Sequence, residues 1–436
     1  MSETTPNWLD AAAALAAMAE GRLTPRALAA ACLARIAERE AAVRAWTEVS
    51  GDALEAELAR IEAIPPDARG PLWGLPVGVK DVFDTADRVT TYGSDIYADH
   101  RPAADAALVA RLRAAGAVLL GKTVATEFAY WRAGATRNPH DLARSPGGSS
   151  SGSAAAVADG MVPLAFGSQT AASTIRPAAY CGVVGFKPSR GLLPTAGVKP
   201  LAPSFDTAGL IARRVSDVAL TGAVLAEAGW ADLGVTAPAP VLARWRGAEW
   251  AAASPAAVAA VEGALERLAA AGARIVEGRV PAPFDGITAA QTRLMAVEAA
   301  AVLAEEAERA PDRLSEPLLS LIEAGRAVPL ATELRDRALL ASAAGEPGPL
   351  FGTAEIIVAP AAMGEAPPLE QGTGSPDLSR AFTALGLPSV TLPCGRGPNG
   401  LPLGLQLAAR PGTDGRLLAV AAWVERCLEP RPERSG

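Results

Sequence analysis

Apolar residues recur at helical spacing through the first 64 residues. Segments 8–21, 26–46 and 52–64 repeat apolar positions every three to four residues, and Thr24-Pro25 is a helix start signal before the second. The apolar run 11–19 follows an acidic, polar start, which favours an amphipathic helix over a signal peptide. We therefore expect the chain to open with helices.

From Pro71 onward the pattern changes to short apolar runs punctuated by glycine. Segments 117–122 and 161–168 are typical of buried strands, and a helix is expected over 104–115. After Gly229 the chain becomes alanine-rich and helical (255–271, 288–310 and 331–344), and strands return at 354–360 and 387–395.

Strand patterns before and after the helical stretch predict one large α/β domain, with a mixed central sheet flanked by helices on both faces. Its expected parts are N-terminal helices, a catalytic core, a variable helical insert that shapes the pocket, and a C-terminal return to the sheet, over residues 1–64, 71–220, 230–350 and 351–436.

Composition narrows the class of protein. The 436 residues carry a net charge of -7 without a Lys/Arg-rich run, which argues against direct nucleic-acid binding. The four cysteines are scattered, with no CxxC, so we expect buried thiols in a reducing cytosol and no metal site. No apolar stretch reaches the roughly 18 residues that a membrane span needs.

Only two histidines occur, and this restricts the chemistry. His100 and His140 lie in loop-like segments near prolines, and neither belongs to a recognisable catalytic triad motif. We interpret both as structural. A hydrolase built from this sequence is therefore expected to use another base.

Residues 116–123, GAVLLGKT, satisfy the P-loop pattern GxxxxGK[ST]. In a P-loop these residues follow a strand and cradle phosphate with their amides, whereas here the four middle residues are apolar and predict a strand themselves. We therefore interpret the match as coincidental and expect no nucleotide cofactor.

Two serine-rich segments stand out, at 147–160 and 167–182. One interpretation is structural: Ser151 or Ser153, and Ser173 or Thr174, would be helix N-caps. The other is functional, because loops of this kind bring hydroxyls and free backbone amides together. The two interpretations remain open on these residues alone.

Lys80 ends the apolar run of LPVGVKDVFD, where a buried lysine is expensive. Asp81 and Asp84 could pair with it, which would make it structural. Alternatively, burial lowers its pKa from roughly 10.4 toward neutrality and makes it a general base for a serine.

Three segments together resemble the amidase signature family of Ser-cisSer-Lys hydrolases, of the bacterial small-amide type: LPVGVKDVFD, SPGGSSSG and ASTIRPAAYCGVVGFKPS. The resemblance covers nearly the whole chain. It implies that Ser173 is the nucleophile, that Ser149 is the bridging serine on a cis peptide after Gly148, and that Lys80 is the terminal base. It also implies amide C–N hydrolysis without metal or organic cofactor.

The same resemblance assigns an oxyanion hole to the backbone amides of Thr170, Ala171, Ala172 and Ser173. Family members usually carry a glycine pair where this chain has two alanines. Alanine keeps its amide, but a positive φ at either position would cost roughly 1 to 2 kcal/mol. We therefore expect a working hole if both backbones have negative φ.

Arg176, Tyr130 and Trp131 are the candidate substrate-binding residues. If the segment at Arg176 is extended, its side chain faces the pocket and binds a substrate carboxylate; the alternative is that it braces the loop. The expected partners are water and a small amide, an anionic one if Arg176 binds a carboxylate, with a homodimer allowed.

Two rivals remain. One is the A subunit of a glutamyl-tRNA amidotransferase, against which the length of the chain argues. The other is a non-catalytic binding protein on the same fold.

Overall fold

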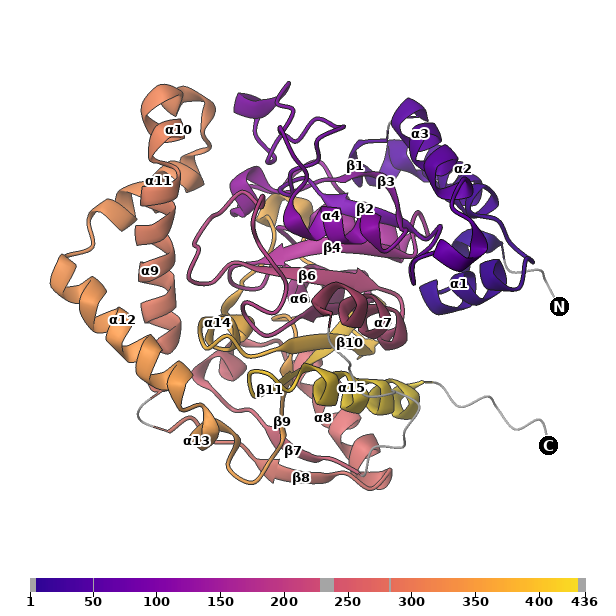
Figure 1. Cartoon of the computed structure of the whole chain (residues 1–436). Coiled ribbons are helices and arrows are strands. Elements are labelled where there is room, and N and C mark those ends of the chain that lie inside the picture. The colour runs from indigo at the N-terminus through magenta and orange to yellow at the C-terminus, as the bar shows by residue number, and fades with distance from the viewer. Residues whose placement is uncertain (1–4, 50, 228–238, 282–283, 430–436) are drawn as a thin grey trace.

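The computed structural model describes residues 5–49, 51–227, 239–281 and 284–429, and a single mixed sheet of eleven strands runs through this part of the chain (Figure 1). The strands are β1 (Trp46–Glu48), β2 (Pro76–Lys80), β3 (Val118–Thr123), β4 (Leu164–Gln169), β5 (Val184–Lys187), β6 (Thr207–Ala212), β7 (Val241–Arg244), β8 (Arg274–Glu277), β9 (Ile356–Pro360), β10 (Ser389–Arg396) and β11 (Pro402–Ala409).

The sheet runs in the order β1-β3-β2-β4-β6-β5-β10-β11-β9-β7-β8. Strand β2 pairs in parallel with β3 and β4, whereas β4 to β6 and β5 to β10 are antiparallel. Every residue of β2, β3, β4 and β6 is buried, as expected for strands covered on both faces. Polar side chains on these strands are therefore buried as well.

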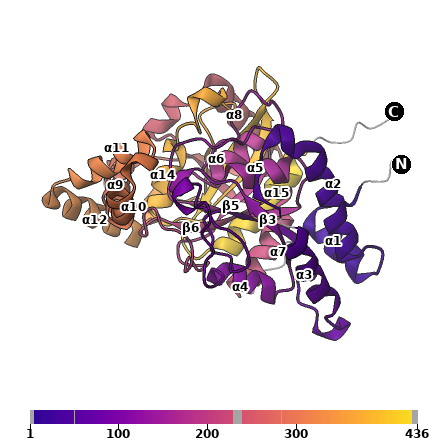
Figure 2. The same ribbon diagram turned by 90° about the horizontal axis from the view of Figure 1, so that it is seen from above.

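Helices flank the sheet. Seen from above, α5 (Ser151–Ala158) and α6 (Ile175–Cys181) lie on one side and α4 (Ala107–Ala114) and α7 (Val215–Ala226) on the other (Figure 2). The remaining flanking helices are α1 (Ala11–Ala19), α2 (Pro25–Val43), α3 (Gly51–Glu62), α8 (Pro255–Ala270) and α15 (Asp414–Leu428). Helix α2 begins as its sequence predicts, because Pro25 is its first residue and the Thr24 hydroxyl accepts from the Ala27 amide.

A helical arm projects from one edge of the molecule (Figure 1, orange). It consists of α9 (Ile287–Val302), α10 (Ala304–Arg309), α11 (Glu316–Arg326) and α12 (Leu330–Gly345), followed by α13 (Gly348–Phe351). Helices α9 and α11 pack closely at Gly325, where a Cβ atom would lie 2.0 Å from the Ala296 carbonyl oxygen. Helix α9 also packs on α14 (Asp377–Ala384) and thereby connects the arm to the body.

The predicted fold class, a mixed sheet flanked by helices, is confirmed. The segment expected to be helical over 230–350 differs in detail, because it also contributes β7 and β8 to the sheet edge. These strands have four residues each, and alternating periodicity is hard to detect in segments so short. In the described part of the chain, no helix is long and apolar enough to cross a membrane.

Candidate active site

Lys80 is the last residue of β2, and its side chain is fully buried. Its Nζ lies 2.6 Å from Ser149 Oγ and 2.8 Å from Ser168 Oγ. Of the two interpretations of Lys80, pairing with an aspartate is wrong, since its side chain contacts hydroxyls and its neighbour Asp81 pairs with Lys122 instead.

Burial lowers the pKa of Lys80 to about 7, because the ammonium form loses its hydration in the protein interior. The charge of Asp206 opposes this shift without cancelling it. A large fraction of Lys80 is therefore neutral near pH 7 and able to accept a proton from a hydroxyl.

The glycine-serine segment brings Ser149 to Lys80. The Gly148–Ser149 peptide bond is cis, as the resemblance implies. Three residues later the backbone approaches the end of β3 so closely that a Cβ atom on Gly152 would lie 2.3 Å from the Val124 nitrogen. Only glycine fits there, so this segment packs tightly against the sheet and is not a flexible linker.

Residues 170–173 form a turn between β4 and α6, and side chains from two distant helices hold its carbonyl groups. Gln291 Nε2 on α9 donates to the Thr170 carbonyl oxygen at 3.0 Å, and Thr383 Oγ1 on α14 donates to that of Ala171 at 2.7 Å. In a trans peptide unit the N–H points away from the C=O. These two contacts therefore fix the directions of the Ala171 and Ala172 amides.

The two alanines adopt the turn without strain, because neither is among the residues with positive φ. In the described part of the chain, the backbone N–H groups of residues 170–173 donate to no other protein group. Such free, oriented amides are what an oxyanion requires.

The helix-cap interpretation of the serines is wrong. Neither α5 nor α6 has a side-chain hydrogen bond from its N-cap residue. Helix α6 is capped instead by Gln169, whose Oε1 accepts from the amides of Thr174 and Ile175 at 2.9 and 3.0 Å. Ser153 Oγ donates to the Phe166 carbonyl oxygen at 2.7 Å and so attaches α5 to the sheet.

A small pocket with a cavity volume of about 30 Å³ opens onto Ser149 and Ser173. Its lining contains both predicted aromatic residues, Tyr130 and Trp131, and Trp131 remains 43% exposed. The other lining residues are Thr126, Ala129, Thr170, Ala171, Arg176, Leu201, Met295, Thr373, Pro376 and Arg380.

Arg176 also lines this pocket, but it lies in helix α6 and not in the extended segment that we assumed. Its guanidinium donates to the carbonyl oxygens of Gly374 at 2.6 Å and Gly148 at 2.8 Å, and to Thr373 Oγ1 at 3.2 Å. These contacts connect α6 to the peptide unit before Ser149 and agree with the loop-bracing alternative.

Sequence reasoning did not single out four polar residues at this site: Ser168, Gln291, Arg380 and Thr383. Ser168 ends a buried strand pattern, which was a usable signal. The other three lie more than 100 residues from Ser173 in the chain and follow no motif, so only the tertiary structure brings them to the turn.

Both histidines lie outside the pocket lining. His140 Nε2 lies 2.9 Å from the Cys181 carbonyl oxygen, and His100 Nε2 lies 3.2 Å from the Tyr92 hydroxyl. The segment that matches the P-loop pattern forms strand β3, as its apolar residues predict, and the side chain of Lys122 is buried.

The family model described as Amidase matches residues 27–418. The A subunit of the glutamyl-tRNA(Gln) amidotransferase from Nitratidesulfovibrio vulgaris (strain DP4) is 34% identical over 93% of this chain and 94% of that protein. The 2-amino-5-chloromuconic acid deaminase of Comamonas testosteroni is 32% identical over 93% of each chain.

Among solved structures, an amidase crystal structure superimposes with a TM-score of 0.89 at 31% identity, over 97% of this chain and 100% of that chain. The peptide amidase from Stenotrophomonas maltophilia does so with a TM-score of 0.83 at 30% identity, over 98% of each chain. The chain therefore belongs to the amidase signature family and is a hydrolase that acts on amide C–N bonds.

Proposed function

We propose that this protein hydrolyses a small amide that carries a carboxylate, through an acyl-enzyme on Ser173. The observation that carries the proposal is the buried Lys80, which contacts the Ser149 hydroxyl at a pocket that Ser173 also lines. Serine is a weak nucleophile unless a base accepts its proton, and neither histidine lines this pocket.

In the proposed relay, neutral Lys80 accepts the proton of Ser149 while the Ser149 oxygen accepts that of Ser173. The Ser173 oxygen attacks the amide carbon, and the amides of residues 171–173 stabilise the oxyanion. The relay then returns a proton to the leaving nitrogen, which departs as ammonia or an amine. Water hydrolyses the resulting ester by the same relay and releases the carboxylic acid.

The charge of the pocket supports an anionic substrate. Arg176 and Arg380 both line it, whereas its lining includes no Asp or Glu side chain. A substrate carboxylate would therefore meet guanidinium groups and no carboxylate among the side chains that line the pocket.

A second candidate is the supply of ammonia to a partner, because the amidotransferase A subunit is 34% identical. This chain aligns with 94% of that protein, so our argument from length does not separate the two functions. Copurification of a tRNA-binding subunit with the native chain would favour the second candidate.

The nucleophile is tested by labelling with a fluorophosphonate and mapping the modified peptide. We expect a single label on Ser173, and none in the Lys80→Met variant, which retains the serine but lacks the base. A label on Ser149 in active enzyme would contradict the proposed assignment. Absence of label and of turnover on every amide would favour the non-catalytic rival.

A further inference from the structure

The two arginines of the catalytic pocket are used differently. The two terminal nitrogens of Arg176 donate to the Gly374 and Gly148 carbonyl oxygens and to Thr373. A carboxylate that took this edge of the guanidinium would have to displace buried carbonyl groups, which would then lose their partners. Both terminal nitrogens of Arg176 therefore already have protein acceptors, and its Nε, which has none, is sealed from solvent.

Arg380 retains a free terminal nitrogen. It lies on α14 and is 8% exposed; its Nε donates to Asp377 Oδ1 at 2.9 Å and one terminal nitrogen donates to Gln291 Oε1 at 2.6 Å. Its other terminal nitrogen donates to no group in the residues that the structure describes, although it is not sealed from solvent. Two N–H bonds thus remain for a ligand.

We propose that Arg380, and not Arg176, binds the substrate carboxylate, which makes monoamides of short dicarboxylic acids and similar ureido acids the substrate class. This inference rests on the proposed function of the pocket. Arg380 is held rigidly by Asp377 and Gln291, so its free nitrogen needs little reorganisation to bind an anion. Because Arg380 is largely buried, a charge-assisted hydrogen bond to it is stronger than one at an exposed surface.

The contact through Gln291 links carboxylate binding to the oxyanion turn. Gln291 accepts from Arg380 with Oε1 and donates to the Thr170 carbonyl oxygen with Nε2. Removing Arg380 therefore leaves a partner of the turn less well ordered and lowers kcat for every substrate to some extent. The selective effect must be measured as the difference between anionic and neutral ligands.

The experiment measures binding and not turnover, so that it does not depend on the catalytic mechanism. Malonamate, succinamate and glutaramate, each with its neutral diamide, are titrated calorimetrically into the Ser173→Ala variant. We expect Arg380→Gln in this background to weaken the best anionic ligand by about tenfold or more and its diamide by less than about threefold. Arg380→Lys should recover part of the loss.

Two matched variants separate Arg380 from its neighbours. Asp377→Asn removes the carboxylate that shares Arg380 and should tighten anionic ligands selectively. Arg176→Lys should weaken anionic and neutral ligands alike, because it disturbs the backbone before Ser149. Equal losses for both ligand classes in Arg380→Gln, a selective loss in Arg176→Lys, or no binding of any anion to the parent pocket would overturn the inference. Failure of the catalytic proposal would show separately, as absent labelling of Ser173.

Discussion

Two fully buried lysines lie at the ends of neighbouring parallel strands and have opposite surroundings. Lys80, on β2, contacts two serine hydroxyls and, within the described residues, no carboxylate. Lys122, on β3, lies 3.5 Å from Asp81 and donates to the Phe83 carbonyl oxygen at 2.5 Å and to Thr90 at 2.8 Å. Both lysines contact hydroxyls, but within the described residues only Lys122 also has a carboxylate partner.

A lowered pKa does not by itself distinguish a base. Burial lowers the pKa of Lys122 to about 8, with Asp81 opposing the shift, and that of Lys80 to about 7. A third buried lysine, Lys187, also has a pKa of about 7, yet in the described part of the chain it donates only to the Pro188 carbonyl oxygen. What separates Lys80 from both is a hydroxyl partner at a pocket, which is the geometry that proton transfer requires.

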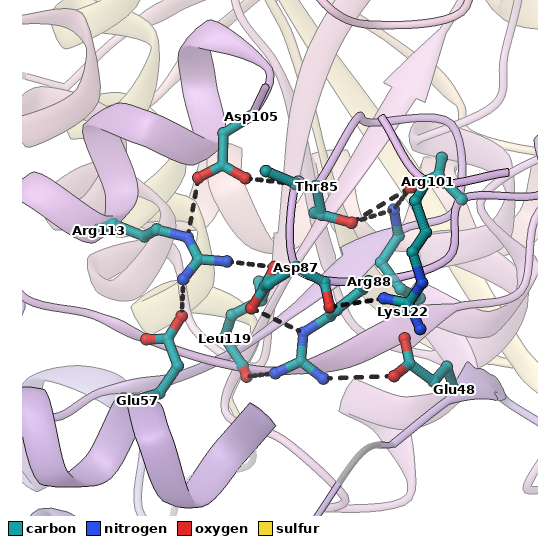
Figure 3. A network of polar contacts seen from close by, with 12 residues as sticks. Glu48, Glu57, Thr85, Asp87, Arg88, Arg101, Asp105, Arg113, Leu119 and Lys122 are labelled. Carbon is teal, nitrogen blue, oxygen red and sulfur yellow. Dashed lines mark hydrogen bonds and ion pairs between the residues drawn. The ribbon is translucent and has the colours of Figure 1, made fainter. Parts of the chain in front are cut away.

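The polar residues around Lys122 form a network of contacts that connects separate elements of the fold (Figure 3). Arg88, fully buried beside it, donates to the Leu119 carbonyl oxygen of β3 at 2.8 Å. Arg113 on α4 pairs with Asp105 at 3.0 Å. These contacts connect a helix, a strand and the loop after β2, and none of these side chains lines the pocket at Ser173. We infer that this region contributes stability and that the Lys80 region contributes chemistry.

Replacement of the two lysines by methionine should separate these roles most sharply. Lys80→Met should reduce kcat by about 10² to 10⁴-fold, the usual contribution of a general base. It should leave Tm unchanged or higher, because it removes a buried amine whose pKa is depressed on folding. Lys122→Met leaves Asp81 buried without its cation, which typically costs about 3 to 5 kcal/mol. Thermal unfolding and steady-state kinetics measure both effects.

The Asp81→Asn/Lys122→Met double variant is the control for this comparison. It removes both charges of the pair, so it should recover most of the stability that Lys122→Met loses and keep near-normal kcat. A Lys122→Met protein that is stable but inactive would show that the division between the two regions is wrong.

The pH dependence of activity tests the same division. Because Lys80 has a pKa near 7, kcat/KM should fall about tenfold per pH unit below 7 and level off above about 8.

The contribution of Lys80 to folding stability changes with pH in the opposite direction to that of a lysine in an ion pair. Because the pKa of Lys80 is lowered on folding, the folded state binds fewer protons than the unfolded state between pH 7 and the ordinary lysine pKa. Lys80 therefore lowers the free energy of unfolding most below pH 7. This cost declines as the pH rises from 7 toward the ordinary lysine pKa.

An acidic activity optimum would contradict the assignment of Lys80 as the base. The double variant at Asp81 and Lys122 provides the control here too, and its pH profile should keep the midpoint of the native enzyme. A shifted midpoint would mean that Lys122 takes part in the titration.

Single hydroxyls offer a finer comparison. Ser168→Ala removes one of the two contacts of Lys80 and should lower kcat by about tenfold with little change in stability, since the base loses an orienting partner. Thr90→Val removes the corresponding contact of Lys122 and should cost about 1 to 2 kcal/mol of stability at nearly normal kcat. Similar kinetic losses in both variants would remove the distinction between the regions.

The sequence alone predicted those strands and site residues that depend on a local pattern of residues. Apolar runs predicted β2, β3 and β4. Three short motifs indicated Lys80, Ser149 and Ser173; in the structure the two serines line one pocket, and Lys80 contacts Ser149. It could not predict features that depend on a contact between segments far apart in the chain or on the cap of a helix by a neighbouring strand. The extended backbone considered for the Arg176 segment was wrong, because the start of α6 depends on Gln169, whose side chain caps the helix from the end of β4.

The smallest effects are expected at the oxyanion turn, which lies beside the Lys80 region but contains no titratable side chain. Ala171 and Ala172 have negative φ, so their methyl groups cause no backbone strain, and Thr383 holds the Ala171 carbonyl in place whichever residue stands there. Ala171→Gly and Ala172→Gly should therefore change kcat by less than about threefold and lower stability by less than about 1 kcal/mol, through the added entropy of the unfolded chain. Thr383→Val provides the contrast, because it frees the carbonyl and should lower kcat more than either glycine variant. A rise in kcat of about 10² in a glycine variant would instead mean that the methyl groups displace an oxyanion donor.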